Sequence, residues 1–192
     1  KQNGKNRIQV YEGNIDAERR NKETGYEQVA PTVYALVAAI DAKDSFTFQH
    51  STNVSQYAVL LAQKLGLPGD DIHTVKVAGL LHDIGKIGIP ESILKKAGKL
   101  TNEEYEIMKS HVQKSIEMIH YLPNMNYVIP AVVSHHERYD GKGYPRGLKG
   151  EGIPFLGRIL AVCDSFDAMI SKRAYKEALS VESVSYTHLT LP

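Results

Sequence analysis

The sequence has one cysteine, almost no net charge and no long apolar run. The lone Cys163 excludes an intrachain disulfide and predicts a reducing compartment, the cytoplasm. The 23 basic and 22 acidic residues give a net charge of +1, which indicates neither a nucleic acid polymer nor a membrane surface as a partner. No apolar run approaches the roughly 20 residues that a membrane-spanning helix needs. The 192 residues suffice for one sizeable core.

Apolar residues recur at helical spacing over most of the chain, which predicts an all-α helical bundle. Gly66 is a helix stop, Asp70 or Asp71 can cap a helix, and Thr101 with Glu104 forms a capping box. The expected helices cover about residues 26–40, 50–65, 70–82, 101–119, 127–136 and 154–170.

The two ends of the chain differ from this helical pattern. Residues 1–12 combine a turn with one alternating strand, 7–11, and are expected to be the remnant of a preceding domain. Residues 13–24 are polar and predict a linker, followed by the main domain at 25–184. Residues 185–192 are an unassigned tail to which no function is given. The missing initial methionine suggests a piece of a longer protein.

The stretch Leu80–Pro90 places His82 and Asp83 side by side at a predicted helix end, among aliphatic residues. A carboxylate buried there without a partner would cost several kcal/mol. A metal ion is the simplest partner for both side chains, and the aspartate can bridge two ions. The alternative is a simple hydrogen bond at the helix end. Lys86, past the helix end, is placed to meet a phosphate.

Seven metal-capable side chains are predicted to point inward or to lie at helix ends. A single inward histidine is usually a core residue, but seven such groups on separate helices favour a metal site. The set lacks thiolates, which argues against structural zinc, and it exceeds the needs of one ion. Two ions suit phosphoryl chemistry. The seven are His50, His82, Asp83, His111, His135, His136 and Asp164.

Three motifs in this order resemble the HD-GYP family: residues 82–86 (HDIGK), 135–137 (HHE) and 143–145 (GYP). The resemblance runs from about Tyr26 to Leu179. It implies a helical bundle of the HD-domain type, with a metal site in its core and a GYP loop. It also implies metal-dependent hydrolysis of cyclic di-GMP to pGpG, or on to GMP, in bacterial second-messenger signalling.

The resemblance assigns roles to individual residues. It makes the seven inward side chains metal ligands, with Asp83 as the bridge, and His82, Asp83 and Lys86 the catalytic residues. Phe46 stands where some members carry a glutamate for a third metal, so two divalent ions are expected, iron or manganese. The residues implied to bind substrate are Lys86, Gly143, Tyr144, Pro145, Arg173 and Lys176.

Two other functions stay open beside this one. A non-catalytic cyclic di-GMP sensor or interaction module is disfavoured by the intact ligand set, and a general HD nucleotide phosphohydrolase by the GYP loop. Residues 3–11 resemble the last strand of a GGDEF domain, which implies such a domain in the same full-length chain.

Several further side chains have two interpretations each. Glu137 and Asp167 are either partners of a ligating histidine or surface charges, and Tyr144 either stacks on a guanine or packs the loop. Cys163 is expected to pack in the core. His73, His120 and His188 show no ligand spacing, and we expect them on the surface.

Overall fold

A computed structural model describes residues 24–40, 42–43, 47–171 and 178–184. Within these ranges every regular element is an α-helix or a short 3-10 helix, and no strand occurs, so the predicted all-α fold is confirmed. No helix in the described part of the chain combines the length and hydropathy needed to cross a bilayer.

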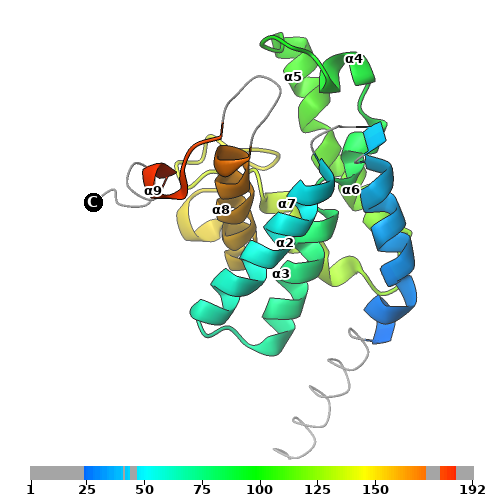
Figure 1. The fold of residues 1–192 in the computed structure, drawn as a ribbon, viewed down its shortest axis with the longest axis vertical. Helices are drawn as coiled ribbons and strands as arrows, with labels where there is room; N and C mark the ends of the chain where they lie inside the picture. The colour runs from blue at the N-terminus through cyan, green and yellow to red at the C-terminus, as the bar shows by residue number, and fades with distance from the viewer. Residues whose placement is uncertain (1–23, 41, 44–46, 172–177, 185–192) are drawn as a thin grey trace, which may run out of the picture.

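The elements follow one another in chain order after a helix over residues 24–40 (Figure 1). They are α2 (Thr47–Lys64), α3 (Gly69–Leu81), η1 (Ile84–Gly88), α4 (Glu91–Leu94), α5 (Asn102–Lys109), α6 (His111–His120), η2 (Asn126–Val128), α7 (Ile129–Ser134), η3 (Gly150–Gly152), α8 (Phe155–Ile170) and α9 (Val181–Val184).

Helices α2 and α3 form a closely packed hairpin. Gly66, with a φ of 71°, follows the end of α2, as its position predicts. A Cβ added to Gly79 would lie 2.6 Å from the Cα of Ser55, so glycine lets the two helices approach. Leu65 was expected on the inward face but is 52% exposed, because it lies beyond the end of α2 and does not continue the helical face.

The capping box that opens α5 is present. The Thr101 hydroxyl accepts the Glu104 backbone amide at 3.2 Å, and the Glu104 carboxylate accepts the Thr101 amide at 2.7 Å. The helix predicted over 101–119 is divided into α5 and α6 at Ser110, where ψ of −14° departs from the α-helical value. The predicted cap of α3 is wrong: Asp70 and Asp71 lie in its first turn, and Pro68 precedes the helix.

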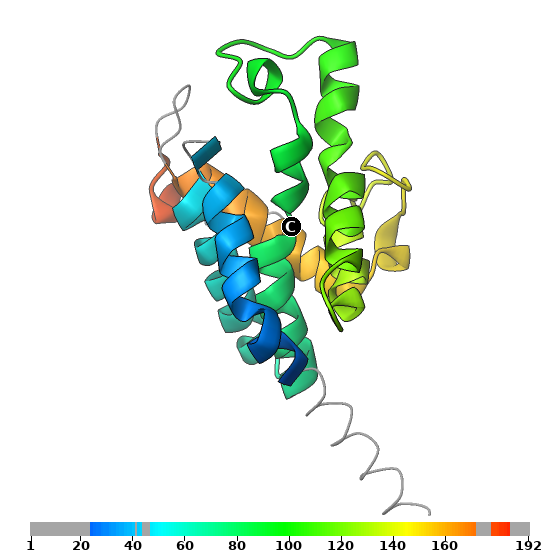
Figure 2. The ribbon, with the colours of Figure 1, turned by 90° about the vertical axis from the view of Figure 1, so that its right-hand side faces the viewer.

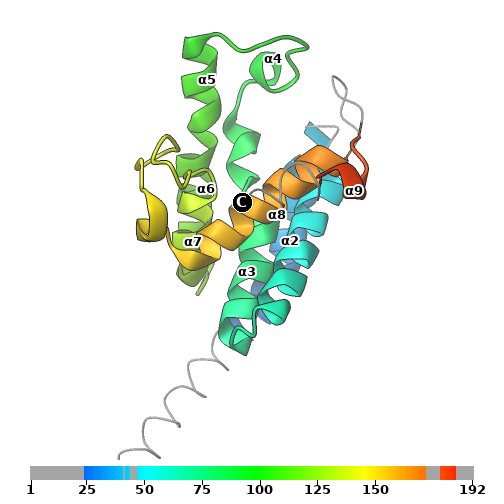
Figure 3. The ribbon, with the colours of Figure 1, turned by 90° about the vertical axis from the view of Figure 1, so that its left-hand side faces the viewer.

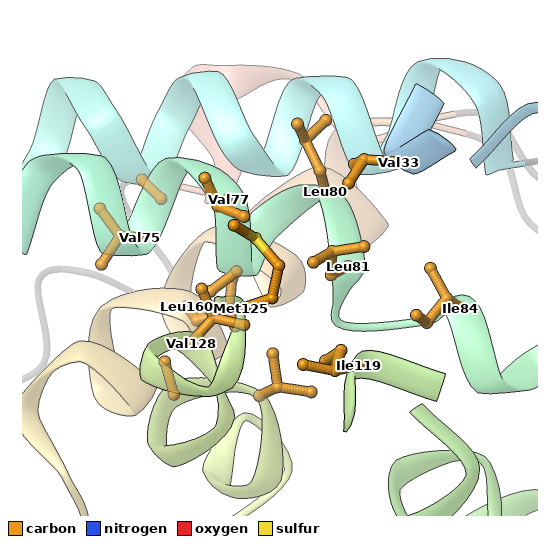
Figure 4. Close-up of a cluster of buried hydrophobic side chains, with 14 of the residues drawn as sticks. Val33, Val75, Val77, Leu80, Leu81, Ile84, Ile119, Met125, Val128 and Leu160 are labelled. Atoms are coloured by element: carbon orange, nitrogen blue, oxygen red, sulfur yellow. The ribbon is translucent and has the colours of Figure 1, made fainter. Parts of the chain in front are cut away.

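Helix α8 crosses between the α2–α3 hairpin and the side of the molecule formed by α5, α6 and α7 (Figure 3). Its Leu160 joins Leu81, Ile119 and Val128 in the buried apolar cluster (Figure 4). The helix over 24–40 lies along the hairpin in two views (Figures 1 and 2) and inserts Val33 into the same cluster. One core therefore joins all the long helices.

Some predictions fall on residues outside the described ranges. These are the strand at 7–11, nearly all of the linker at 13–24, Phe46, Arg173, Lys176, His188 and the tail at 185–192. The boundaries 1–12, 13–24, 25–184 and 185–192 stay predictions.

Candidate metal centre

His82 and Asp83 lie between the end of α3 and the start of η1, and both side chains are buried. The Ser115 hydroxyl on α6 fixes this turn, because it donates to the His82 carbonyl at 2.9 Å and accepts the Gly85 amide at 2.8 Å. A Cβ on Gly85 would lie 2.0 Å from the carbonyl oxygen of His111. Only glycine therefore lets η1 pack on α6 at this distance.

Three buried histidines contact the backbone in the same way, through Nδ1 and the carbonyl oxygen three residues earlier. The pairs are His82 with Gly79 at 2.8 Å, His111 with Met108 at 2.7 Å and His135 with Val132 at 2.5 Å. A carbonyl only accepts, so Nδ1 carries the proton and Nε2 keeps its lone pair. These three Nε2 atoms and Asp83 Oδ1 are buried and make no hydrogen bond within the described part of the chain. Such unprotonated donors fit a metal ion.

The donors form two groups that share Asp83. One group is His50, His82 and Asp83, the other is Asp83, His111, His135 and His136, and the ligand atoms of each lie within 4.8 Å of one another. Asp83 Oδ2 lies 3.3 Å from His82 Nε2, and Oδ1 lies 3.3 Å from His111 Nε2. Asp164 Oδ1 lies 3.2 Å from His50 Nε2. All seven side chains singled out in the sequence are therefore brought together.

The charges in this cluster suit a cation. Burial alone would raise the pKa of Asp83, but the ammonium of Lys86 and the neighbouring histidines hold it well below its usual range. Burial lowers the pKa of His111 and of His135, and it lowers that of His136 to about 4. The imidazoles of His111, His135 and His136 are thus neutral beside an ionised carboxylate at neutral pH.

Asp167 on α8 holds His50, a contact that the sequence left undecided. Its Oδ2 lies 2.7 Å from His50 Nδ1, its Oδ1 accepts from Asn53 at 2.9 Å, and Ser171 donates to Oδ2 at 3.2 Å. Burial would lower the pKa of His50, but hydrogen bonds to Asp164 and Asp167 raise it to about 9. Asp167 is buried and is no surface charge. In the sequence, Asp167 follows Asp164 by three residues, which puts both carboxylates on one helix face. This spacing was the signal that Asp167 lies near the donor cluster.

Lys86 lies beside the cluster on η1. Its Nζ is 2.6 Å from Asp83 Oδ2, and its side chain is about one-fifth exposed. The ammonium thus lies beside the carboxylate shared by the two donor groups and is partly open to solvent.

Glu137 organises the loop after α7. Its two carboxylate oxygens accept the backbone amides of Arg146 at 2.7 Å and Leu148 at 2.9 Å, and the side chain is buried. Glu137 is therefore neither a surface charge nor, among the described residues, a hydrogen-bond partner of a ligating histidine. It binds the backbone of the loop. In the sequence, a carboxylate four residues before Gly141, where the glycine-rich stretch begins, was the available signal for such a loop anchor.

The GYP segment lies against the cluster. A Cβ on Gly143 would lie 2.3 Å from the Arg138 backbone nitrogen, so the loop needs glycine there. The Tyr144 amide donates to the His136 carbonyl at 3.1 Å, and the two rings stack with centroids 4.7 Å apart. The peptide bond from Tyr144 to Pro145 is cis. Tyr144 therefore packs the loop onto a histidine of the donor cluster.

The remaining side chains have mixed outcomes. Cys163 is buried in the core and His120 is exposed, as predicted. The surface prediction for His73 is wrong. It is half-buried, its Nε2 lies 3.0 Å from the Tyr127 hydroxyl, and its ring contacts Tyr26.

The helical fold and the His-Asp turn agree with the comparison against known families. The HD domain family profile matches residues 35–185. The chain belongs to the HD domain family. Its similarity to HD-GYP-type phosphodiesterases bears out the sequence resemblance.

Relatives of this HD domain have named activities. It is 42% identical over 159 residues to a cyclic di-GMP phosphodiesterase response regulator of Xanthomonas campestris, covering 82% of this chain and 42% of that protein. It is 37% identical over 163 residues to 3'3'-cGAMP-specific phosphodiesterase 1 of Vibrio cholerae, covering 85% of this chain and 38% of that protein. The chain thus spans about two-fifths of the length of these relatives.

A solved structure supports the fold. An HD-GYP-type protein of Bdellovibrio bacteriovorus superposes with a TM-score of 0.60 at 20% identity, covering 95% of this chain and 62% of that one. At this identity the likeness concerns the fold alone.

Proposed function

We propose that this HD domain is a metal-dependent phosphodiesterase that hydrolyses cyclic di-GMP to pGpG or on to GMP. The observation that carries the proposal is the place of Asp83 between two groups of imidazole donors. Paired metal sites are typical of phosphoryl transfer, because two ions stabilise the attacking and leaving oxygens. The substrate is supported by the 42% identity to a relative named for cyclic di-GMP.

The donor set supports two divalent ions, for which we propose iron or manganese. His50, His82, Asp83 and Asp164 would hold one ion, and Asp83, His111, His135 and His136 the other. When bound, such ions polarise the phosphodiester and activate a water molecule. Asp167 orients the His50 ring, and the backbone carbonyls fix the tautomers of three other histidines.

The other predicted residues would act on the substrate. Lys86 would neutralise the reacting phosphate, since its ammonium already lies beside Asp83. Gly143, Tyr144 and Pro145 would form one wall of the site. Arg173 and Lys176 stay predicted phosphate contacts outside the described residues.

A second substrate, 3'3'-cGAMP, is favoured by the 37% identity to a relative specific for it. Both candidate substrates contain guanine and two phosphodiester bonds, so the same metal centre serves either. The proposed setting includes the cytoplasm and a GGDEF domain in the same full-length chain.

The test combines metal content with turnover. The purified chain, loaded anaerobically with iron(II) or with manganese(II), should hold two ions per chain and hydrolyse cyclic di-GMP. Asp83→Ala should abolish both, while Glu117→Gln, an exposed carboxylate on α6, should change neither. Full metal content with tight binding but no hydrolysis would favour a sensor. Hydrolysis of mononucleotides alone would favour a general nucleotide phosphohydrolase.

A further inference from the structure

A group of aromatic and cationic side chains extends from the metal centre to the surface. Tyr144, stacked on His136, meets the ring edge of Tyr105 on α5 with centroids 6.3 Å apart. Lys109, one helical turn further along α5, places Nζ 5.3 Å from the Tyr105 ring centre and 5.7 Å from that of Tyr144. We call Tyr105, Lys109 and Tyr144 the rim cluster. Two views show α5 and the loop after α7 on the same side of the molecule (Figures 2 and 3).

The fold does not require an aromatic residue at position 105. None of the residues of α5 is buried, and Tyr105 is 47% exposed although it touches the loop. Lys109 is paired with Glu106 at 2.6 Å, but the Glu106 side chain is 69% exposed. The Lys109 side chain itself is 25% exposed, so the pair lies at the boundary with solvent. Solvent screens the Glu106 carboxylate, and a ligand can replace it as the partner of the ammonium.

We propose that Tyr105 and Lys109 form a purine-binding subsite, in which Tyr105 stacks on a base and Lys109 donates to that base. This inference rests on the phosphodiesterase function proposed above, and it names the group that selects the base. With the reacting phosphate at the donor cluster, one base of a cyclic dinucleotide extends toward the rim. Stacking on an aromatic ring accepts any base.

Lys109 gives the subsite its preference. Guanine presents O6 and N7 as two neighbouring acceptors, whereas adenine presents an amino donor in place of O6. An ammonium has only donors, so it binds guanine and is repelled by the adenine amino group. The subsite therefore accepts a cyclic dinucleotide that offers at least one guanine.

The experiment compares Tyr105→Ala, Tyr105→Phe and Lys109→Gln with two matched controls. The controls are Tyr121→Ala, an exposed tyrosine after α6, and Lys95→Gln, a lysine directly after α4 that is likewise paired with a glutamate, Glu91. Metal-loaded protein is assayed on cyclic di-GMP, cyclic di-AMP and bis(p-nitrophenyl) phosphate, which has no nucleobase. Metal content is measured for every variant.

Tyr105→Ala should lower kcat/KM for cyclic di-GMP, relative to bis(p-nitrophenyl) phosphate, by about tenfold. The decrease should come from a higher KM. Tyr105→Phe, which keeps the aromatic ring, should have the kcat/KM of the unmodified protein. Lys109→Gln should lower the preference for cyclic di-GMP over cyclic di-AMP by about tenfold. Metal content should stay constant, and the controls should match the unmodified protein. Equal losses on all three substrates would show that Tyr105 only supports the loop, and no loss would remove it from the site.

Equilibrium dialysis with labelled cyclic di-GMP separates this inference from the proposed function. If the unmodified protein binds cyclic di-GMP without hydrolysing it, the phosphodiesterase proposal fails. Weaker binding by Tyr105→Ala would then still support the subsite. If the unmodified protein does not bind cyclic di-GMP, both proposals are overturned.

Discussion

Asp167 Oδ2 lies 2.7 Å from Nδ1 of His50, although 117 residues separate the two in the chain. This contact joins α8 to α2 inside the donor cluster. A carboxylate on the far nitrogen fixes the orientation of a ligating imidazole and increases its basicity. His50 thus presents Nε2 to Asp83 and Asp164.

Asp167→Asn should weaken metal binding about 10- to 100-fold, because the amide cannot serve as an ionised partner for Nδ1. The measurement is a titration of metal-free protein with manganese(II), followed by thermal shift or calorimetry. Glu117→Gln is the control, since its carboxylate is exposed on α6. Unchanged affinity in Asp167→Asn would leave this carboxylate a purely structural role.

Asp83→Ala should lose both ions, because Asp83 is the one residue common to the two donor groups. His50→Ala should mainly weaken one ion, since it belongs to one group. Elemental analysis of the folded proteins, checked by circular dichroism, counts the ions. Full occupancy in Asp83→Ala would refute the bridging role.

Glu137→Gln should loosen the loop after α7. The backbone amides of Arg146 and Leu148 each donate to a different oxygen of the Glu137 carboxylate. A glutamine has only one acceptor oxygen, so one of the two amides would lose its partner. Leaving one amide without its partner costs about 1–3 kcal/mol. Hydrogen exchange of residues 137–148 should accelerate by about tenfold or more. The control is Glu151→Gln on η3, whose side chain is 84% exposed, and an equal effect there would contradict the prediction.

Gly85→Ala should destabilise the fold by about 1–3 kcal/mol and weaken metal binding, because the added Cβ would lie 2.0 Å from the His111 carbonyl oxygen. The turn would have to move, and Asp83 with it. Gly98→Ala is the matched control, since no atom of the described residues lies within 4 Å of its added Cβ. Denaturant unfolding of the metal-free proteins measures the difference in stability. Equal midpoints for the two variants would show that η1 can shift without a loss of folding free energy.

Cys163 should make stability depend on pH in alkaline solution. Burial raises the pKa of its thiol to about 12, from an ordinary value of 9. Below pH 9 the thiol is protonated in both folded and unfolded chains. Between pH 9 and pH 12 the unfolded chain loses the proton more readily, so stability falls as pH rises. Unfolding midpoints across this range should fall more steeply for the unmodified protein than for Cys163→Ala, and parallel curves would contradict this.

Local sequence determined a large part of this molecule. Apolar spacing fixed the helices, and the capping box from Thr101 to Glu104 and the stop at Gly66 placed two of their ends, because these signals act between near neighbours. The sequence also predicted that His82 and Asp83 lie at a helix end, because the surrounding aliphatic residues and the glycines that follow are near neighbours in the chain. Individual histidines were candidates through their place on apolar faces.

Tertiary structure decided how these groups meet. The position of Asp83 beside His82 predicted that it can bridge two ions, but the two donor groups form only because α2, α6, α7 and α8 pack around this turn. Packing also turned Glu137 toward loop amides, placed Asp167 on His50 and buried half of His73. Each of these contacts joins residues from separate elements or loop segments, and its geometry exists only once the core has brought those segments together.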